Sequence, residues 1–395
     1  MRHREVFVPL AHPPGDAQAD FGEALVGIGG VEQKAHFFCM ELPHSDACFV
    51  VAFPAENTES FLEGHNRAFD YFQGVPRTIL YDNTRIVVAQ ITGDGERKPT
   101  EGFSGLQSHY LFAAKFGRPG KGNDKGNVEG LVGYARRNFM VPVPRYASWE
   151  ELNEHLLEEC RRRQDKRVHG EKETIGERLE RDKERLLLLP PVPHEACDRK
   201  STRASSQALV RYETNDYSVP VEYGHRQVLL KAFVWEVVIS ATTEVIARHR
   251  RSYGREEMIF DPLHYLTLLE QKTNALDQAA PLQGWQLPDV FAELRRQMEA
   301  RLGKRGRREY VQVLMLMKTF SMDEVTRAAQ QALQMRAIAF DAVKHLLLCA
   351  IEQRPPKLDL ENYPHLPAAE VALTRAADYQ VLLTQAPVHP AGGSR

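Results

Sequence analysis

The sequence predicts an α/β protein: a mixed α/β layer fold, followed by a small β-barrel and a C-terminal helical region. Three strand-like runs stand close together near the N-terminus, and a helix and a further strand follow them. After residue 207 the pattern changes to short β runs, and after residue 256 it becomes helical. Closely spaced strands form antiparallel meanders, whereas strands that alternate with helices form sheets covered by helices. We therefore expect more than one structural unit in the 395 residues.

The first three runs span residues 19–28, 31–42 and 47–53. The Gly29–Gly30 pair separates the first two, and a short turn separates the second from the third. Connections of this length join neighbouring antiparallel strands. The N-terminal segment therefore predicts a three-stranded meander.

The next segment, 57–72, has apolar residues at helical spacing, and Asn57 or Thr58 can cap it. His65 lies on the apolar stripe of this helix, so we interpret it as a packed histidine rather than a ligand. Residues 75–82 then form an apolar run of strand length. Such a run is typical of a strand buried on both faces.

Two further helices are predicted at 104–114 and 127–139, with a Gly- and Pro-rich irregular segment, 116–127, between them. The apolar residues of 127–139 mark one face of the helix. Glu129 lies on an adjacent face, together with Lys125, Gly133 and Arg136.

Residues 148–189 are strongly helical, and a linker at 190–206 follows them. From 207 to 250 short β runs recur about every ten residues, which predicts the small β-barrel. Three sequence pairs have the spacing of a capping box: Ser148 with Glu151, Thr174 with Glu177, and Ser321 with Glu324.

These changes of pattern divide the chain into six segments. They are an extended lead-in, an α/β core, a helical extension with its linker, the β-barrel, a helical region and a tail that we expect to be partly disordered. Their bounds are 1–14, 15–145, 146–206, 207–255, 256–352 and 353–395.

Composition excludes some classes of protein. No apolar run is long enough for a membrane helix, and the N-terminus has no apolar core of a signal peptide, so we expect a cytoplasmic protein without membrane contact. The formal net charge is −2, yet basic residues gather at 161–167, 248–255 and 301–308. Each cluster is either a solvated surface or a contact to a phosphate backbone.

Three acidic residues have the placement that a two-metal phosphoryl-transfer site needs: Asp20 early in the first strand, Asp82 at the end of a later strand, and Glu129 near the start of a helix. Carboxylates are the preferred ligands of hard divalent cations, and two such ions can stabilise the attacking and leaving oxygens of a phosphodiester. If the strands of Asp20 and Asp82 are neighbours, their carboxylates can converge.

Other carboxylates compete with this set, because the chain has 53 acidic residues. Spacing does not exclude Glu23, Asp16, Asp94 or Asp124. Glu23 is expected to point away from Asp20, since side chains alternate along a strand. Asp94 and Asp124 lie in polar, Gly-rich segments where turn formation explains an Asp equally well.

Three motifs together resemble the IstA-type transposases of bacterial insertion sequences. They are HPPGDAQADFGEA, ILYDN, and FGRPGKGNDKGNVEGLVGYARRNFMVPVP, and the resemblance continues through most of the chain. It implies an RNase H-like catalytic core of the retroviral-integrase branch, with a mixed sheet and flanking helices. It also implies a catalytic, metal-binding triad of Asp20, Asp82 and Glu129, with two Mg²⁺ or Mn²⁺ ions.

The resemblance further implies double-stranded DNA as substrate, a homo-oligomer on DNA and a separate AAA+ ATPase helper. Lys121, Lys125, Arg136 and Arg137 surround Glu129 and are the candidate phosphate contacts. The family carries helix-turn-helix segments before the catalytic core, which this sequence lacks, so we interpret it as a truncated copy. The alternatives are an RNase H-like nuclease without strand transfer and an inactive DNA-binding remnant.

Overall fold

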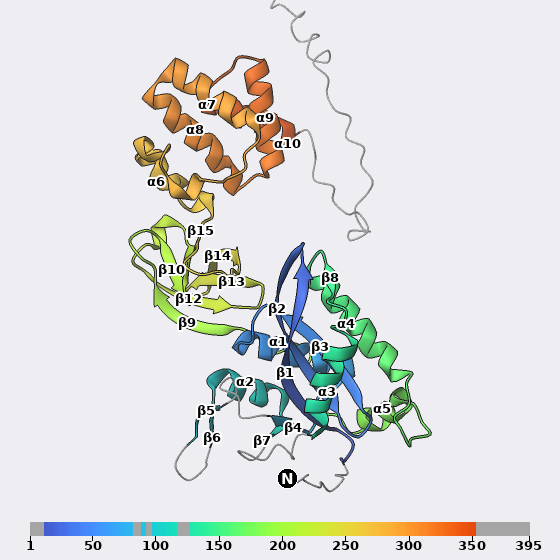
Figure 1. Ribbon diagram of the computed structural model, residues 1–395. Helices are drawn as coiled ribbons and strands as arrows, with labels where there is room; N and C mark the ends of the chain where they lie inside the picture. The colour runs from blue at the N-terminus through green and yellow to red at the C-terminus, as the bar shows by residue number, and fades with distance from the viewer. Residues whose placement is uncertain (1–11, 82–87, 92–96, 117–125, 353–395) are drawn as a thin grey trace, which may run out of the picture. The chain divides into compact units, whose positions relative to one another are not determined.

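The computed structural model describes residues 12–81, 88–91, 97–116 and 126–352, and the chain divides into two compact units, Met1–Leu287 and Pro288–Arg395. The first unit contains a mixed sheet with the strand order β3-β2-β1-β4-β7, and β8 pairs with one end of β1 (Figure 1). The predicted mixed α/β fold is therefore confirmed.

The N-terminal meander is confirmed, although its first strand begins three residues earlier than predicted. Strand β1 (Asp16–Ile28) pairs antiparallel with β2 (Val31–Leu42), which pairs antiparallel with β3 (Ala47–Phe53). Gly29 and Gly30 have φ angles of 58° and 83°, which glycine adopts without steric cost, so the two glycines make the tight turn.

The remaining strands of this sheet are parallel. Strand β4 (Thr78–Tyr81) lies beside β1, β7 (Ala113–Phe116) lies beside β4, and the short β8 (Arg145–Tyr146) meets the end of β1. The predicted helix at 104–114 is wrong at its C-terminal end. Helix α2 (Glu101–Tyr110) ends at the left-handed Leu111, and the next residues form β7.

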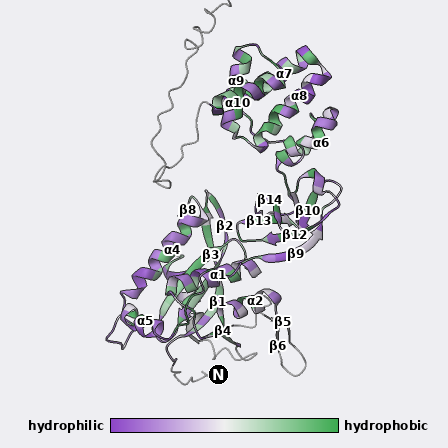
Figure 2. Cartoon of the chain, turned by 180° about the vertical axis from the view of Figure 1, so that it is seen from behind, coloured by the Kyte–Doolittle hydropathy of each residue, from purple (hydrophilic) through white to green (hydrophobic). Residues whose placement is uncertain are grey.

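Helices cover both faces of the sheet. On one face, α1 (Thr58–Phe72) and α2 share a buried cluster with β1–β4. On the other face, α3 (Gly126–Asn138) and α4 (Trp149–Gln164) pack on β1, β2 and β3. Figure 2 shows hydrophobic residues on these strands and mostly hydrophilic ones on α4. His65 of α1 is fully buried and bonded to Phe61 and Tyr81, so it is the packed histidine that the sequence predicts.

Two of the three predicted capping boxes are complete, at α5 (Ile175–Lys183) and α9 (Met322–Gln334). At α4 the Ser148 side chain accepts from the Glu151 backbone N–H, but the Glu151 carboxylate accepts from the backbone N–H of Ala147 instead of Ser148. All three residue pairs therefore mark helix starts.

The predicted β-barrel is not found: within the part of the chain that the structure describes, this region forms open sheets. One four-stranded sheet has β14 and β9 at its edges, and a three-stranded sheet has the order β10-β11-β15. The polar strand β9 lies in the predicted linker; it is an exposed edge strand without an apolar alternation. The bounds of this region are β9 (Asp198–Arg203), β10 (Leu209–Tyr212), β11 (Asn215–Ser218), β12 (Gln227–Ala232), β13 (Glu236–Ala241), β14 (Glu244–Arg250) and β15 (Met258–Ile259). Strands β5 (Val88–Ile91) and β6 (Arg97–Pro99) form a separate two-stranded ribbon.

The C-terminal part is helical, as predicted. The short helix α6 (Leu266–Gln271) belongs to the first unit. The described part of the second unit packs four helices together: α7 (Asp289–Leu302), α8 (Lys304–Met315), α9 (Met322–Gln334) and α10 (Phe340–Glu352).

Gly306 sets the approach of α8 to α7. A Cβ at this position would overlap the backbone carbonyl of Met298, so the two helices can lie this close only with glycine there. We expect Gly306→Ala to destabilise the second unit by about 1–3 kcal/mol, the usual cost of overpacking. Thermal unfolding checks this expectation. A gain in stability, as helix propensity alone favours for Ala, would contradict it.

Glu41 makes stability depend on pH. Burial raises the pKa of this carboxyl from 4.5 to about 8, against the opposing effect of Arg163 at 3.9 Å. Because the folded-state pKa lies above the unfolded one, the contribution of Glu41 to the free energy of unfolding is fully present below about pH 4.5. It is lost as pH rises through about 8. We expect the melting temperature to fall across this window. In Glu41→Gln this part of the slope is expected to disappear, and an unchanged slope would exclude Glu41 as its source.

Candidate active site

Asp20 lies on the face of the sheet that α3 and α4 cover. Its neighbour Ala19 belongs to the buried cluster of the opposite face, while its cross-strand partner Cys39 belongs to the cluster beneath α3 and α4. Asp20 is half-buried, and its Oδ1 accepts a hydrogen bond from the backbone N–H of Phe21 at 3.0 Å. The carboxylate therefore has a fixed backbone contact on a rigid strand.

The strand that precedes Asp82 is the parallel neighbour of the strand that carries Asp20. In the register of β1 and β4, Asp16 lies opposite Thr78, Ala17 opposite Ile79 and Gln18 opposite Leu80. The described part of β4 ends at Tyr81, and Asp82 lies outside the described residues. The strand adjacency on which the convergence of Asp20 and Asp82 depends is thus present.

Helix α3, which contains Glu129, runs along β1. A Cβ on Gly22 would lie 2.7 Å from Cγ1 of Val132, so the helix approaches the strand closely at this point. One turn further on, Nε of Arg136 donates to the backbone carbonyl of Glu23 at 3.0 Å. Glu129 stands one turn before Val132; its backbone belongs to α3, but its side chain lies outside the described part.

Of the four predicted phosphate contacts, two lie within the described residues and two lie outside them. Arg136 and Arg137 are exposed at the C-terminal end of α3. Lys121 and Lys125 lie outside the described residues. The hydrogen bond to Glu23 holds the Arg136 guanidinium over β1. Arg136 lies on the same helix as Glu129.

The rival carboxylates have other surroundings. Glu23 is exposed, and its Oε2 accepts from Nζ of Lys34 at 2.9 Å, which lowers the pKa of Glu23. Glu23 lies three residues after Asp20 on β1. Because this offset is odd, the two side chains leave the strand on opposite faces, as predicted. Asp16 begins β1, and Asp94 and Asp124 lie outside the described residues.

Glu56 is an acidic neighbour that sequence reasoning missed. Burial raises its pKa, and the negative charges of Asp20 and Glu23 raise it further. His36 lies between these groups, with Nδ1 at 3.6 Å from Glu23 and 3.9 Å from Glu56. Nothing in the loop sequence around Glu56 marks it, because its neighbour His36 is distant from it in the chain.

Among the described residues, no three His, Cys, Asp or Glu side chains stand close enough to hold a metal ion. Two of the three predicted ligands, Asp82 and the side chain of Glu129, lie outside the described part of the chain. The donor set at Asp20 is nevertheless of the right chemistry, because carboxylate oxygens are what Mg²⁺ and Mn²⁺ prefer.

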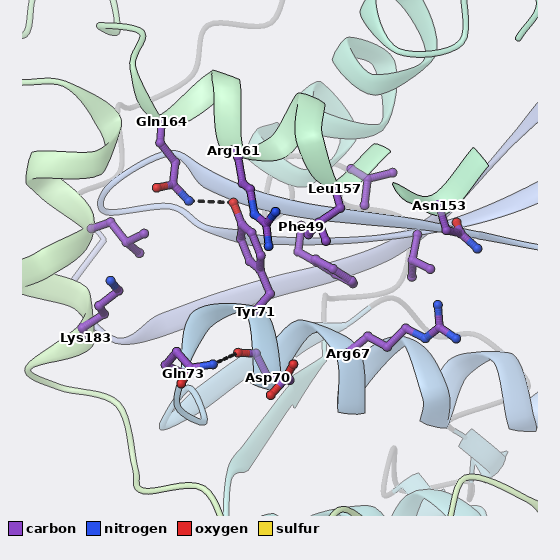
Figure 3. Close-up of a pocket in the computed structure, with 13 residues that line it drawn as sticks. Phe49, Arg67, Asp70, Tyr71, Gln73, Asn153, Leu157, Arg161, Gln164 and Lys183 are labelled. Atoms are coloured by element: carbon purple, nitrogen blue, oxygen red, sulfur yellow. Dashed lines mark hydrogen bonds between the residues drawn. The ribbon is translucent and has the colours of Figure 1, made fainter. Parts of the chain in front are cut away.

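A cavity of about 430 Å³ lies elsewhere, at the edge strand β3 between α1, α4 and α5 (Figure 3). Tyr71 and Gln164 face each other across it, and Nε2 of Gln164 donates to the Tyr71 hydroxyl at 2.6 Å. Two strands separate β3 from β4, and Asp20 is not among the described residues that line this cavity.

The described helices include none with the length and apolarity that a membrane crossing requires. The five cysteines are unpaired thiols, and four of them are buried.

Known proteins resemble this chain over most of its length. A transposase of Aminobacter aminovorans is 32% identical over 365 residues, which cover 90% of this chain and 71% of the relative. The transposase for insertion sequences IS1326/IS1353 of Pseudomonas aeruginosa is 30% identical over 89% of this chain and 70% of its own length. The transposase for insertion sequence element IS21 of the same species is 29% identical over 66% of this chain and 67% of its own.

Residues 189–261 match the family described as Mu transposase, C-terminal domain. Among solved structures, the HTLV-2 integrase catalytic core domain in complex with magnesium is similar to 42% of this chain and 97% of that chain, with 15% identity and a TM-score of 0.29.

Proposed function

The chain belongs to the family of insertion-sequence transposases that includes those of IS1326 and IS21, and we propose that Asp20, Asp82 and Glu129 carry its reaction. It is a DNA transposase, an enzyme of the polynucleotidyl transferase type. The proposed reaction is hydrolysis of a phosphodiester that frees a 3′-hydroxyl at the end of the element. Attack of this 3′-hydroxyl on a phosphodiester of target DNA then joins the end of the element to the target.

The observation that carries the proposal is the register of β1 and β4. If this register continued for two residues beyond Gln18 and Leu80, position 82 would lie opposite position 20. Ala17 and Ile79, a matched pair in this register, both belong to the cluster under α1. Since facing pairs share a side of the sheet, Asp20 and Asp82 would share the other side, beneath α3.

The direction of α3 supports Glu129 as the third member. Val132 meets β1 at Gly22 and Arg136 meets it at Glu23, so the helix advances along β1 in the strand's own direction. One turn before Val132, Glu129 would therefore stand over the part of β1 that carries Asp20.

The residues present suit a pair of divalent cations. Three clustered carboxylates would repel one another unless a cation neutralised them. When bound, Mg²⁺ or Mn²⁺ would activate the nucleophile and stabilise charge on the phosphate. Asp20, Asp82 and Glu129 would hold the two ions, while Lys121, Lys125, Arg136 and Arg137 would orient the DNA backbone.

The sheet order, with a three-stranded meander and parallel strands beside its first strand, supports an RNase H-like core. We expect double-stranded DNA as substrate, a homo-oligomer on that DNA, and an AAA+ ATPase as helper. We expect the reaction to take place in the cytoplasm.

The test uses the 395-residue chain and labelled duplexes that carry the two ends of its own element. We expect Mg²⁺- or Mn²⁺-dependent cutting, and joining of pre-cut ends to a second duplex. Cutting without joined products would identify a nuclease. DNA binding without cutting or joining would identify an inactive remnant and refute the proposed reaction.

A further inference from the structure

The region that matches the Mu transposase C-terminal domain packs into the α/β core. The turn between β12 and β13 inserts Val234, which is 2% exposed, into the cluster shared by α1 and the sheet. Next to it, Trp235 packs on Trp149 of α4, with ring centroids 6.1 Å apart. Residues 189–261 therefore meet the core through a packed interior rather than a loose linker, and we call this contact the joint.

A buried ion pair lies at the centre of the joint. Arg251 and Glu59 have side chains that are 1% and 2% exposed, and the Arg251 guanidinium donates to the Glu59 carboxylate. Arg251 also donates to the backbone carbonyl of Phe233 at 3.0 Å. Its guanidinium lies over the rings of Tyr212 and Tyr253, at 5.1 and 4.9 Å from their centroids. Arg251 belongs to the basic cluster 248–255, yet it faces the interior and cannot contact phosphate.

Further bonds restrict the Glu59 carboxylate. The Tyr212 hydroxyl lies 3.3 Å from the Glu59 carboxylate and 3.1 Å from that of Asp198, so its one proton is shared between these two acceptors. A buried ion pair gains little stability over apolar side chains of the same volume, because both charges lose their hydration. Its hydrogen bonds are directional, however, so they fix the orientation of the parts they join. The pair therefore contributes geometry more than stability.

The joint lies at the start of α1, which shares a buried cluster with β1, the strand of Asp20, and with β4, the strand that precedes Asp82. Glu59 is the second residue of α1. Two residues further along α1, the Phe61 ring lies 5.7 Å from the ring of Tyr81, the residue before Asp82.

We propose that residues 189–261 hold DNA and that Arg251 is a positioning residue of the transposase reaction: paired with Glu59, it fixes this region on α1, so that the DNA meets the carboxylates in one register. This inference rests on the proposed function. It assigns to a buried arginine a control over where the DNA is cut.

The test compares cut positions on end-labelled duplexes of the element's own ends. In Arg251→Met the uncompensated Glu59 carboxylate is expected to lower the melting temperature. The double variant Glu59→Leu/Arg251→Met removes both charges, and we expect it to fold with a melting temperature near that of the wild type. We expect its products to spread over several neighbouring phosphodiesters, and the rate at the normal position to fall by about 10²-fold.

Arg67→Met is the matched control. Arg67 lies on α1, outside residues 189–261, and pairs with Glu63 at 2.7 Å, but its side chain is 38% exposed. We expect the wild-type cut position and rate in this variant. A folded double variant that cuts at the single normal position, at any rate, overturns the positioning role, because lost stability changes yield but not position. A wild-type chain that cuts no DNA refutes the proposed function itself and the positioning role with it.

Discussion

Asp20→Asn is expected to reduce both cutting and joining of DNA by about 10³-fold or more, since a charged metal ligand worth several kcal/mol is lost. The amide has the shape of the carboxylate, so the fold and DNA binding are expected to remain. Time courses of labelled-duplex cutting at saturating Mg²⁺ measure the change, and an electrophoretic shift measures DNA binding.

Glu23→Gln is the matched control for this variant. Glu23 lies three residues along the same strand, but its side chain is exposed and bonded to Lys34. We expect activity close to that of the wild type. Equal losses in the two variants would show that negative charge near β1, rather than the Asp20 carboxylate, supports the reaction.

Gly22→Ala is expected to lower activity by about 10²-fold, with a loss of about 1–3 kcal/mol in stability. The added Cβ would overlap the Phe37 ring and approach Val132, so α3 must move away from β1. That movement would carry Glu129 away from Asp20. Single-turnover cutting rates and thermal unfolding, measured on the same preparation, check both effects.

Gly130→Ala provides the comparison for Gly22→Ala. A Cβ on Gly130 meets nothing within 4 Å, and Ala favours a helix more than Gly. We expect normal activity, although Gly130 lies next to Glu129 in sequence. If Gly22→Ala kept full activity, the close approach of α3 to β1 would have no part in the reaction.

Local hydrophobic patterns predicted the sheet well where they were strong. The meander at 19–53 and α1 follow directly from alternation and helical spacing, and β4 from its apolar run. The polar strand β9 has no such pattern, because its place at a sheet edge leaves it exposed. The barrel prediction failed for a related reason: strand spacing indicates turns, but which edges pair depends on contacts distant in sequence.

The candidate site could be predicted only in part. Side-chain alternation placed Glu23 away from Asp20, and the parallel pairing of β1 with β4 bears out the strand adjacency that the site requires. Glu56 and Arg251 could not be found in this way. Their surroundings come from packing between distant segments, and Arg251 in the sequence is one more cation in a basic cluster.

The most direct test of the shared carboxylate site is a crystal structure of the chain with Mn²⁺, located by its anomalous scattering. We expect an ion bound by carboxylate oxygens of both Asp20 and Asp82 at about 2.1 Å, with Glu129 completing the site. Mn²⁺ bound elsewhere, or Asp20 and Asp82 oxygens too far apart to share an ion, would contradict the account.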